Sequence, residues 1–191
     1  REEKRPEPLR VYIQINTSGE EAKSGITPLL DEGSASKDHP LLELTRHILT
    51  SCPHIRFSGL MTIGAAQNSQ TADAEKVQSR EDIIKANPDF EKLITSRRML
   101  VQALRKDEQV NKAVSDSSST DASITSYYQE KLLSGDDETG GLELSMGMSA
   151  DMEIATMAGS DNVRVGSECF GSRTTRDEAM KAMEEELKGS A

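Results

Sequence analysis

The chain has 191 residues, 35% of them hydrophobic and 29% charged, which suffices for one globular domain with a modest core. Its formal net charge of −10 argues against nucleic acid and anionic membrane surfaces as partners, because both attract basic faces. The two cysteines form neither a disulfide framework nor a CxxC pair, so we expect no metal site and two reduced thiols.

The amino-terminal segment, residues 1–8, is charged and contains two prolines. It lacks the apolar core of a signal peptide, and no run in the chain approaches the ~20 apolar residues of a membrane-spanning helix. Because the sequence begins at Arg1 rather than Met, we expect that its natural N-terminus is missing. These features favour a cytoplasmic protein, with a mitochondrial location left open by the missing segment.

Four segments are predicted to be strands because they are short, apolar and rich in β-branched residues. In chain order they are residues 9–16, 55–64, 142–146 and 162–167.

Helices are predicted between and after these strands, from apolar spacing and from residues typical of helix ends. Pro40 and Pro88 stand near the starts of two of them, Ser149 is the predicted N-cap of the third, and Gly159 follows that helix as its C′ residue. The expected helices cover residues 39–52, 88–106, 124–135, 149–158 and 175–188.

Strands and helices alternate, which predicts an α/β fold with a parallel sheet and right-handed crossovers. Periodicity fits an open four-stranded layer and half of an eight-stranded barrel equally well. In both architectures, ligands bind at the carboxyl ends of the strands. Three predicted ends carry small or hydroxyl residues that suit a phosphate, at 16–19, 145–147 and 166–167, although glycines after strands also form ordinary turns.

Arg164 alternates with Val163 and Val165, so its side chain is predicted to face opposite to both. If the valines pack against helices, Arg164 points into the space that the sheet encloses, where its charge needs a partner. A polar ligand, a structural ion pair and a surface position on a short edge strand all remain open. No histidine spacing, GxSxG or GxGxxG sequence indicates acid–base, nucleophilic or dinucleotide chemistry, so no catalytic residue is predicted.

Four blocks of the chain resemble successive blocks of the pyridoxal-phosphate homeostasis protein family: VYIQINTSGEEAKSG, FSGLMTIGA, LSMGMSADMEIATMAGS and VRVGSECFGSR. The resemblance implies a (β/α)8 barrel of the alanine-racemase N-terminal-domain type, monomeric in full-length members, that carries pyridoxal 5′-phosphate without turnover. Residues 1–191 would then be the C-terminal half of one barrel domain, with four β/α units and polar insertions near 65–87 and 107–140. The second insertion contains a Ser/Asp-rich run, residues 115–123, that is expected not to order itself.

The resemblance also implies a cofactor site at the tips of the last two strands. Hydroxyls and backbone donors there would bind the phosphate. Arg164 would lie beside the pyridine nitrogen and keep it unprotonated, which suits holding the cofactor more than carbanion chemistry. The six implied cofactor-binding residues are Ser145, Met146, Gly147, Arg164, Gly166 and Ser167.

The family's Schiff-base lysine and the blocks around it do not occur in this sequence, and Lys23 aligns with a different family lysine. We therefore expect a truncated protein that binds pyridoxal phosphate weakly at best. Two alternatives are a racemase-like enzyme acting on amino acids and a non-functional fragment. The racemase would need a second base, commonly a tyrosine, but Tyr12 lies in a strand and Tyr127 and Tyr128 lie in a polar insertion.

Overall fold

The computed structural model describes residues 7–32, 38–65, 68, 79–116, 122–134, 137–171 and 180. Its centre is a sheet of four parallel strands in the order β1-β2-β3-β4, so each strand pairs with its neighbours in the sequence. The expected α/β fold with a parallel sheet is confirmed. The strands are β1 (Leu9–Ile15), β2 (Ile55–Thr62), β3 (Glu143–Met148) and β4 (Asn162–Arg164).

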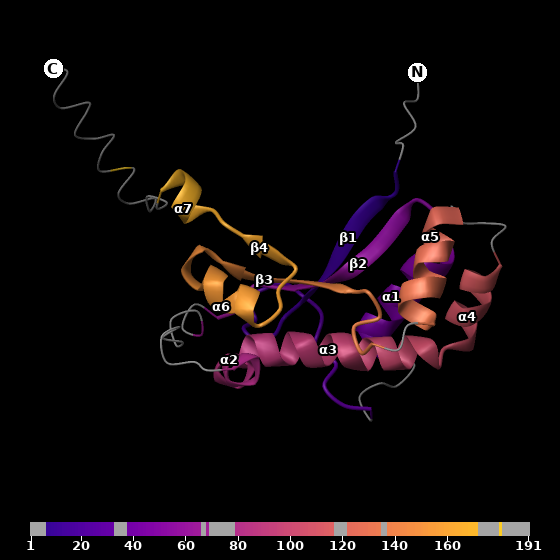
Figure 1. Ribbon diagram of the computed structural model, residues 1–191, viewed down its shortest axis with the longest axis horizontal. Helices are drawn as coiled ribbons and strands as arrows, with labels where there is room; N and C mark the ends of the chain where they lie inside the picture. The colour runs from indigo at the N-terminus through magenta and orange to yellow at the C-terminus, as the bar shows by residue number, and fades with distance from the viewer. Residues whose placement is uncertain are drawn as a thin grey trace, which may run out of the picture.

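Helices fill the connections between the strands and one follows β4, and Figure 1 shows α3, the longest helix of the described residues, running beneath the sheet. α1, α4 and α5 gather near one end of α3, while α2 and α6 lie near its other end. The helices are α1 (Pro40–Ser51), α2 (Arg80–Ala86), α3 (Pro88–Arg105), α4 (Glu108–Ser115), α5 (Ala122–Tyr127), the π-helix η3 (Tyr128–Leu133), the 3-10 turn η4 (Ser149–Asp151), α6 (Met152–Met157) and α7 (Ser167–Phe170).

The two faces of the sheet differ in character because side chains alternate along each strand. Ile13, Leu60 and Leu144 form one row across β1, β2 and β3, and all three are buried in the hydrophobic core. The adjacent row contains Tyr12 and Glu143, and the Tyr12 hydroxyl donates to the Glu143 carboxylate. One face therefore packs against helices, and the other carries hydrogen-bonded polar side chains.

Both predicted proline-led helices begin where expected. Pro40 and Pro88 occupy first-turn positions, where the missing N–H costs nothing. The preceding residues cap these helices: His39 Nδ1 accepts from Leu41 N at 3.2 Å, and Asn87 Oδ1 accepts from two amides of α3.

The polar stretches contain more structure than their composition indicates. α2 lies in the first of them, and α4, α5 and η3 lie in the second. Val110 and Val114 of α4, Ile124 of α5 and Leu132 of η3 are all buried in the core, so one or two buried aliphatic residues per helix suffice here. Most of the Ser/Asp-rich run and most of the predicted helix 175–188 lie outside the described residues.

The last two strands differ from their predicted bounds. β3 continues to Met148, past Gly147, whose φ of +89° had no counterpart in the predicted pattern. β4 ends at Arg164 rather than at residue 167. Ser149 consequently opens the 3-10 turn η4 instead of capping α6, while Gly159, with φ of +96°, follows that helix as expected.

Candidate functional site

The carboxyl ends of β1 and β2 are joined by buried hydroxyls. The Thr17 and Thr62 hydroxyl oxygens lie 2.7 Å apart, and the Thr62 hydroxyl also donates to Ile15 O at 3.0 Å. Lys92 of α3 donates from Nζ to Thr17 O at 2.7 Å. These bonds satisfy the Thr17 and Thr62 hydroxyls and the Lys92 amine within the protein itself.

The loop after β1 is organised by Asn16. Its amide nitrogen donates to Glu20 O and Lys23 O, each at 3.0 Å, and its Oδ1 accepts from Gly19 N at 3.0 Å. Lys23 in turn donates to Gly64 O, beyond the end of β2, at 3.0 Å. The small and hydroxyl residues at 16–19 thus form a turn. Of the two explanations given above, a phosphate site and an ordinary turn, these contacts favour the turn.

Arg164 is the candidate residue with the most informative surroundings. Val163 packs against the core, and Arg164 lies on the opposite face, which also carries Asn162. Its Nη2 donates to Thr62 O at the end of β2, whereas its Nη1 is buried and has no hydrogen-bond partner among the described residues. Burial lowers the pKa of Arg164 and nearby Asp151 raises it.

Ser145 lies in the middle of β3, not at its end. Its side chain is buried, and its hydroxyl donates to Asn162 Oδ1 of β4 at 3.2 Å. The hydroxyl oxygen retains acceptor capacity, but its proton is engaged. Ser145 therefore links β3 to β4 on the face that carries Arg164.

Met146 and Gly147 contribute to the packing of β3 against its neighbours. The Met146 side chain is fully buried, and its backbone N–H donates to the Ser160 hydroxyl at 3.2 Å. A Cβ on Gly147 would lie 2.3 Å from Ala155 Cβ, so glycine allows α6 to approach β3. A phosphate near Met146 would have to compete with Ser160 for that N–H.

Gly166 and Ser167 follow β4 and are exposed. The Gly166 N–H donates to the Ser149 hydroxyl at 3.1 Å, which joins the segment after β4 to the segment after β3. Within the described residues, no hydrogen bond joins Ser145 to Gly166 or Ser167. Ser149 is a further candidate residue that sequence reasoning missed, because β3 was expected to end before Gly147.

Cationic side chains concentrate at this edge of an acidic protein. Lys92, Lys23 and Arg164 each donate to a backbone carbonyl oxygen at or just beyond the ends of β1 and β2. Lys23 Nζ also lies 2.7 Å from Glu20 Oε1, so Lys92 and Arg164 are the cations at this edge that have no ion pair among the described residues. No group of three or more His, Cys, Asp or Glu side chains in the described part of the chain could hold a metal ion.

No described helix is both long and apolar enough to cross a membrane.

Curated proteins named pyridoxal phosphate homeostasis protein match most of this chain. The protein from Schizosaccharomyces pombe is 37% identical over 168 residues, covering 88% of this chain and 47% of its own length. The mouse protein is 34% identical over 87% of this chain and 42% of its own, and the Haemophilus influenzae protein is 30% identical over 87% and 46%.

The chain is a homologue of the pyridoxal phosphate homeostasis proteins. The resemblance predicted from the four sequence blocks is thereby confirmed. The chain spans about half the length of these curated homologues. No family model matches it. A crystal structure of an unknown protein from Bifidobacterium adolescentis is 26% identical and covers 86% of this chain and 44% of its own, with a TM-score of 0.37.

Proposed function

We propose that this chain is a non-enzymatic pyridoxal 5′-phosphate-binding protein that takes part in pyridoxal phosphate homeostasis. The names of its homologues support the cofactor class. The single structural observation that supports a ligand at the β3–β4 tip is the buried Nη1 of Arg164, which has no partner among the described residues. A buried charged donor without an acceptor is costly, and an anionic or ring-nitrogen acceptor would relieve that cost.

The proposed site uses the face of the sheet that carries Arg164. The phosphate would lie at the end of β4, where Gly166 and Ser167 are exposed and the Ser149 hydroxyl is within reach of Gly166 N. Arg164 would face the pyridine nitrogen from the position at which Thr62 O already holds one end of its guanidinium. A bound pyridoxal ring can act as an electron sink, but a fixed guanidinium beside its nitrogen weakens that property.

The architecture that accompanies this proposal is a barrel of the alanine-racemase N-terminal-domain type. The sequential order of four parallel strands, with helices on one face, is compatible with one arc of such a barrel. Under the proposal, residues 1–191 form a single unit with polar insertions near 65–87 and 107–140.

The surroundings of the three tyrosines favour the proposed non-enzymatic function over a racemase, which would need a tyrosine as its second base. Burial, and secondly the Glu143 carboxylate, raise the pKa of Tyr12 to about 12, so its phenol is a poor base near neutral pH. The Tyr127 and Tyr128 hydroxyls donate to Gly141 O and accept from Phe57 N, respectively, both at 2.6 Å. Each tyrosine therefore has a structural partner.

Non-covalent binding is the remaining part of the proposal. Lys23 and Lys92 stand at the same edge of the sheet, and both amines already donate to backbone carbonyl oxygens. We infer that the phosphate and ring contacts, rather than a lysine adduct, hold the cofactor.

An equilibrium titration of the whole chain tests this proposal. Pyridoxal 5′-phosphate should bind, and pyridoxal without phosphate should bind at least about tenfold more weakly, because charged hydrogen bonds contribute roughly 1.5–3 kcal/mol. Borohydride treatment followed by mass spectrometry should leave the chain unmodified. Equal binding of the two compounds would contradict the phosphate site, and stoichiometric reduction onto one lysine would contradict non-covalent binding.

A further inference from the structure

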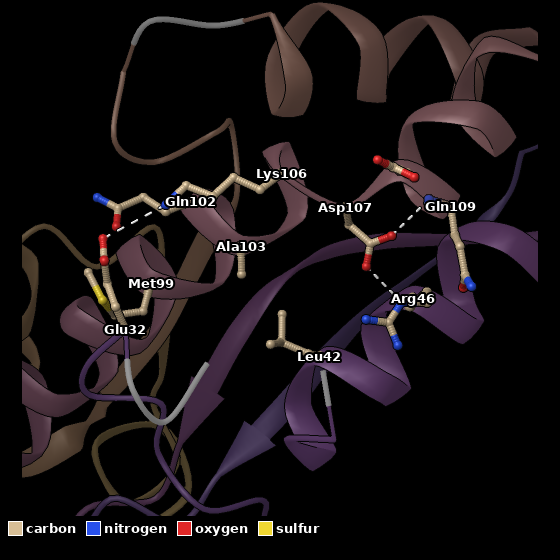
Figure 2. A pocket seen from close by; sticks show the side chains of 10 residues that line it. Glu32, Leu42, Arg46, Met99, Gln102, Ala103, Lys106, Asp107 and Gln109 are labelled. Atoms are coloured by element: carbon tan, nitrogen blue, oxygen red, sulfur yellow. Dashed lines mark hydrogen bonds and ion pairs between the residues drawn. The ribbon is translucent and has the colours of Figure 1, made fainter. Parts of the chain in front are cut away.

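A hollow lies between α1, α3 and the start of α4, away from the strand ends described above. Its volume is about 470 Å³, and Figure 2 shows the side chains around it. It is lined by residues of these helices, by Lys106 and Asp107 between α3 and α4, and by Glu32; no residue of the candidate cofactor site contributes. We call this hollow the α1–α3 pocket.

Arg46 of α1 is held rigidly in the wall of this pocket. Its Nε donates to Asp107 Oδ2 at 2.7 Å. Asp107 is itself fixed, since its Oδ1 accepts from the amides of Gln109 and Val110 at the start of α4. The carboxylate is thus fully engaged, and it orients the guanidinium through one nitrogen.

The other two nitrogens of Arg46 lack protein acceptors. The contact with Asp107 is made by Nε. Within the described part of the chain, neither Nη1 nor Nη2 makes a hydrogen bond or an ion pair. The Arg46 side chain is 20% exposed, and neither Nη atom is among the fully buried donors, so solvent reaches them as the structure stands. Figure 2 shows both Nη atoms on the side of the guanidinium away from Asp107, with one of them directed toward Leu42.

The rest of the pocket combines an apolar floor with a charged rim. Leu42 and Met99 are buried, and Ala103 presents its methyl group to the hollow. On the far rim, Lys106 Nζ lies 3.9 Å from Glu32 Oε1, and both side chains are about three-quarters exposed. Such an exposed pair contributes little and leaves the ammonium able to turn toward a ligand.

We propose that the α1–α3 pocket binds a small organic acid, with its carboxylate on the Nη edge of Arg46 and its apolar body over Leu42 and Met99. Guanidinium donors in a planar fork match a carboxylate in a bidentate arrangement. The volume falls within the ~300–1,000 Å³ range of small-molecule sites. This site is independent of the proposed pyridoxal phosphate site.

Hexanoate and hexylamine are suitable probes because they share one apolar body and carry opposite charges. Isothermal titration calorimetry on the whole chain should show saturable, one-to-one binding of hexanoate. Hexylamine should bind at least about tenfold more weakly, since it cannot accept from Arg46. Equal binding of the two probes, or no hexanoate binding, would overturn the proposal.

Three variants assign the binding to this pocket. Arg46→Met should weaken hexanoate binding at least about tenfold, whereas Arg98→Met, which removes the same charge from an exposed position on α3, should leave it unchanged. Ala103→Met should block binding by filling the hollow without touching the Arg46–Asp107 pair, so it remains informative if the loss of that pair unfolds the chain. Hexanoate affinity that is unchanged in Arg46→Met or in Ala103→Met would overturn the assignment.

Discussion

The two ends of the sheet's carboxyl edge carry similar polar residues, but the hydrogen-bonding groups of these residues find partners in different ways. Where β1 and β2 end, Thr17 and Thr62 bond to each other, and two lysines donate to backbone carbonyl oxygens. Where β3 and β4 end, a guanidinium nitrogen of Arg164 is buried without a partner in the described residues, and Gly166 and Ser167 are exposed. In the first region the strand-end hydroxyls and lysines are satisfied within the protein, although Asp89 Oδ1 just beyond β2 has no partner among the described residues. In the second region the group without a partner is a charged donor, Arg164 Nη1.

This difference separates residues that hold the fold from residues that are available for binding. Hydroxyls and glycines at strand ends look alike in a sequence, yet at β1 they close a turn around Asn16 and at β4 they stay accessible. Substitutions in the first region should therefore change stability, and substitutions in the second should change affinity.

Thr62→Val should give the largest effect. It removes the hydroxyl that bonds Ile15 O and leaves the Thr17 hydroxyl buried without that partner, so the free energy of unfolding should fall by about 1–3 kcal/mol. Urea denaturation measures the change. The double variant with Thr17→Val should recover part of the loss, and Thr50→Val, on the surface of α1, serves as the control. A loss no greater than that of the control would contradict the comparison.

Arg164→Met should mainly reduce affinity. Pyridoxal 5′-phosphate binding should weaken at least about tenfold, or ~1.4 kcal/mol, because the guanidinium contact is lost. The free energy of unfolding should change by less than about 1 kcal/mol, since the substitution also removes a buried donor that has no partner among the described residues. Arg98→Met controls for charge in the same titration. Unchanged affinity together with a large loss of stability would assign Arg164 to the fold and not to the site.

The smallest effect concerns pH in the β1–β2 region. Burial lowers the pKa of His39 below its ordinary 6.5, and its Nδ1 accepts from Leu41 N at the start of α1. Between the lowered folded pKa and 6.5 the unfolded chain binds more protons, so stability should be greatest above pH 6.5 and should fall on acidification through that window.

His39→Asn tests this dependence because asparagine caps helices without titrating. The variant should lose part of the fall in unfolding free energy measured between pH 7 and pH 5. His47→Asn, at an exposed position of α1, is the matched control. An identical pH dependence in wild type and His39→Asn would show that this histidine is not responsible.

Strong periodicity made much of the fold predictable from the sequence. The four strands and the helices α1 and α3 carry apolar residues at regular spacing, and Pro40 and Pro88 mark the helix starts. α2 and α4 were missed because they carry few apolar residues and owe their order to tertiary packing; Val110 and Val114 alone anchor α4 in the core. Local composition contains no signal for such long-range contacts.

The candidate site was predictable only in part. Alternation with Val163 correctly placed Arg164 on the face away from the helices. The contact between Ser149 and Gly166 was not predictable, because it depends on where β3 ends. Gly147 suggested an earlier end, yet its positive φ lets the strand continue and brings Ser149 beside the segment that follows β4.

The strand order has a consequence for how the chain is made. Every strand pair joins consecutive strands, so each new β/α unit finds its pairing surface already synthesised when it emerges from the ribosome. The pairing of β2 with β3 joins residues as far apart as Gly59 and Glu143, so it closes a longer loop than the other two pairings and should be the slowest of the three to form. Vectorial folding during translation is the route that this topology favours.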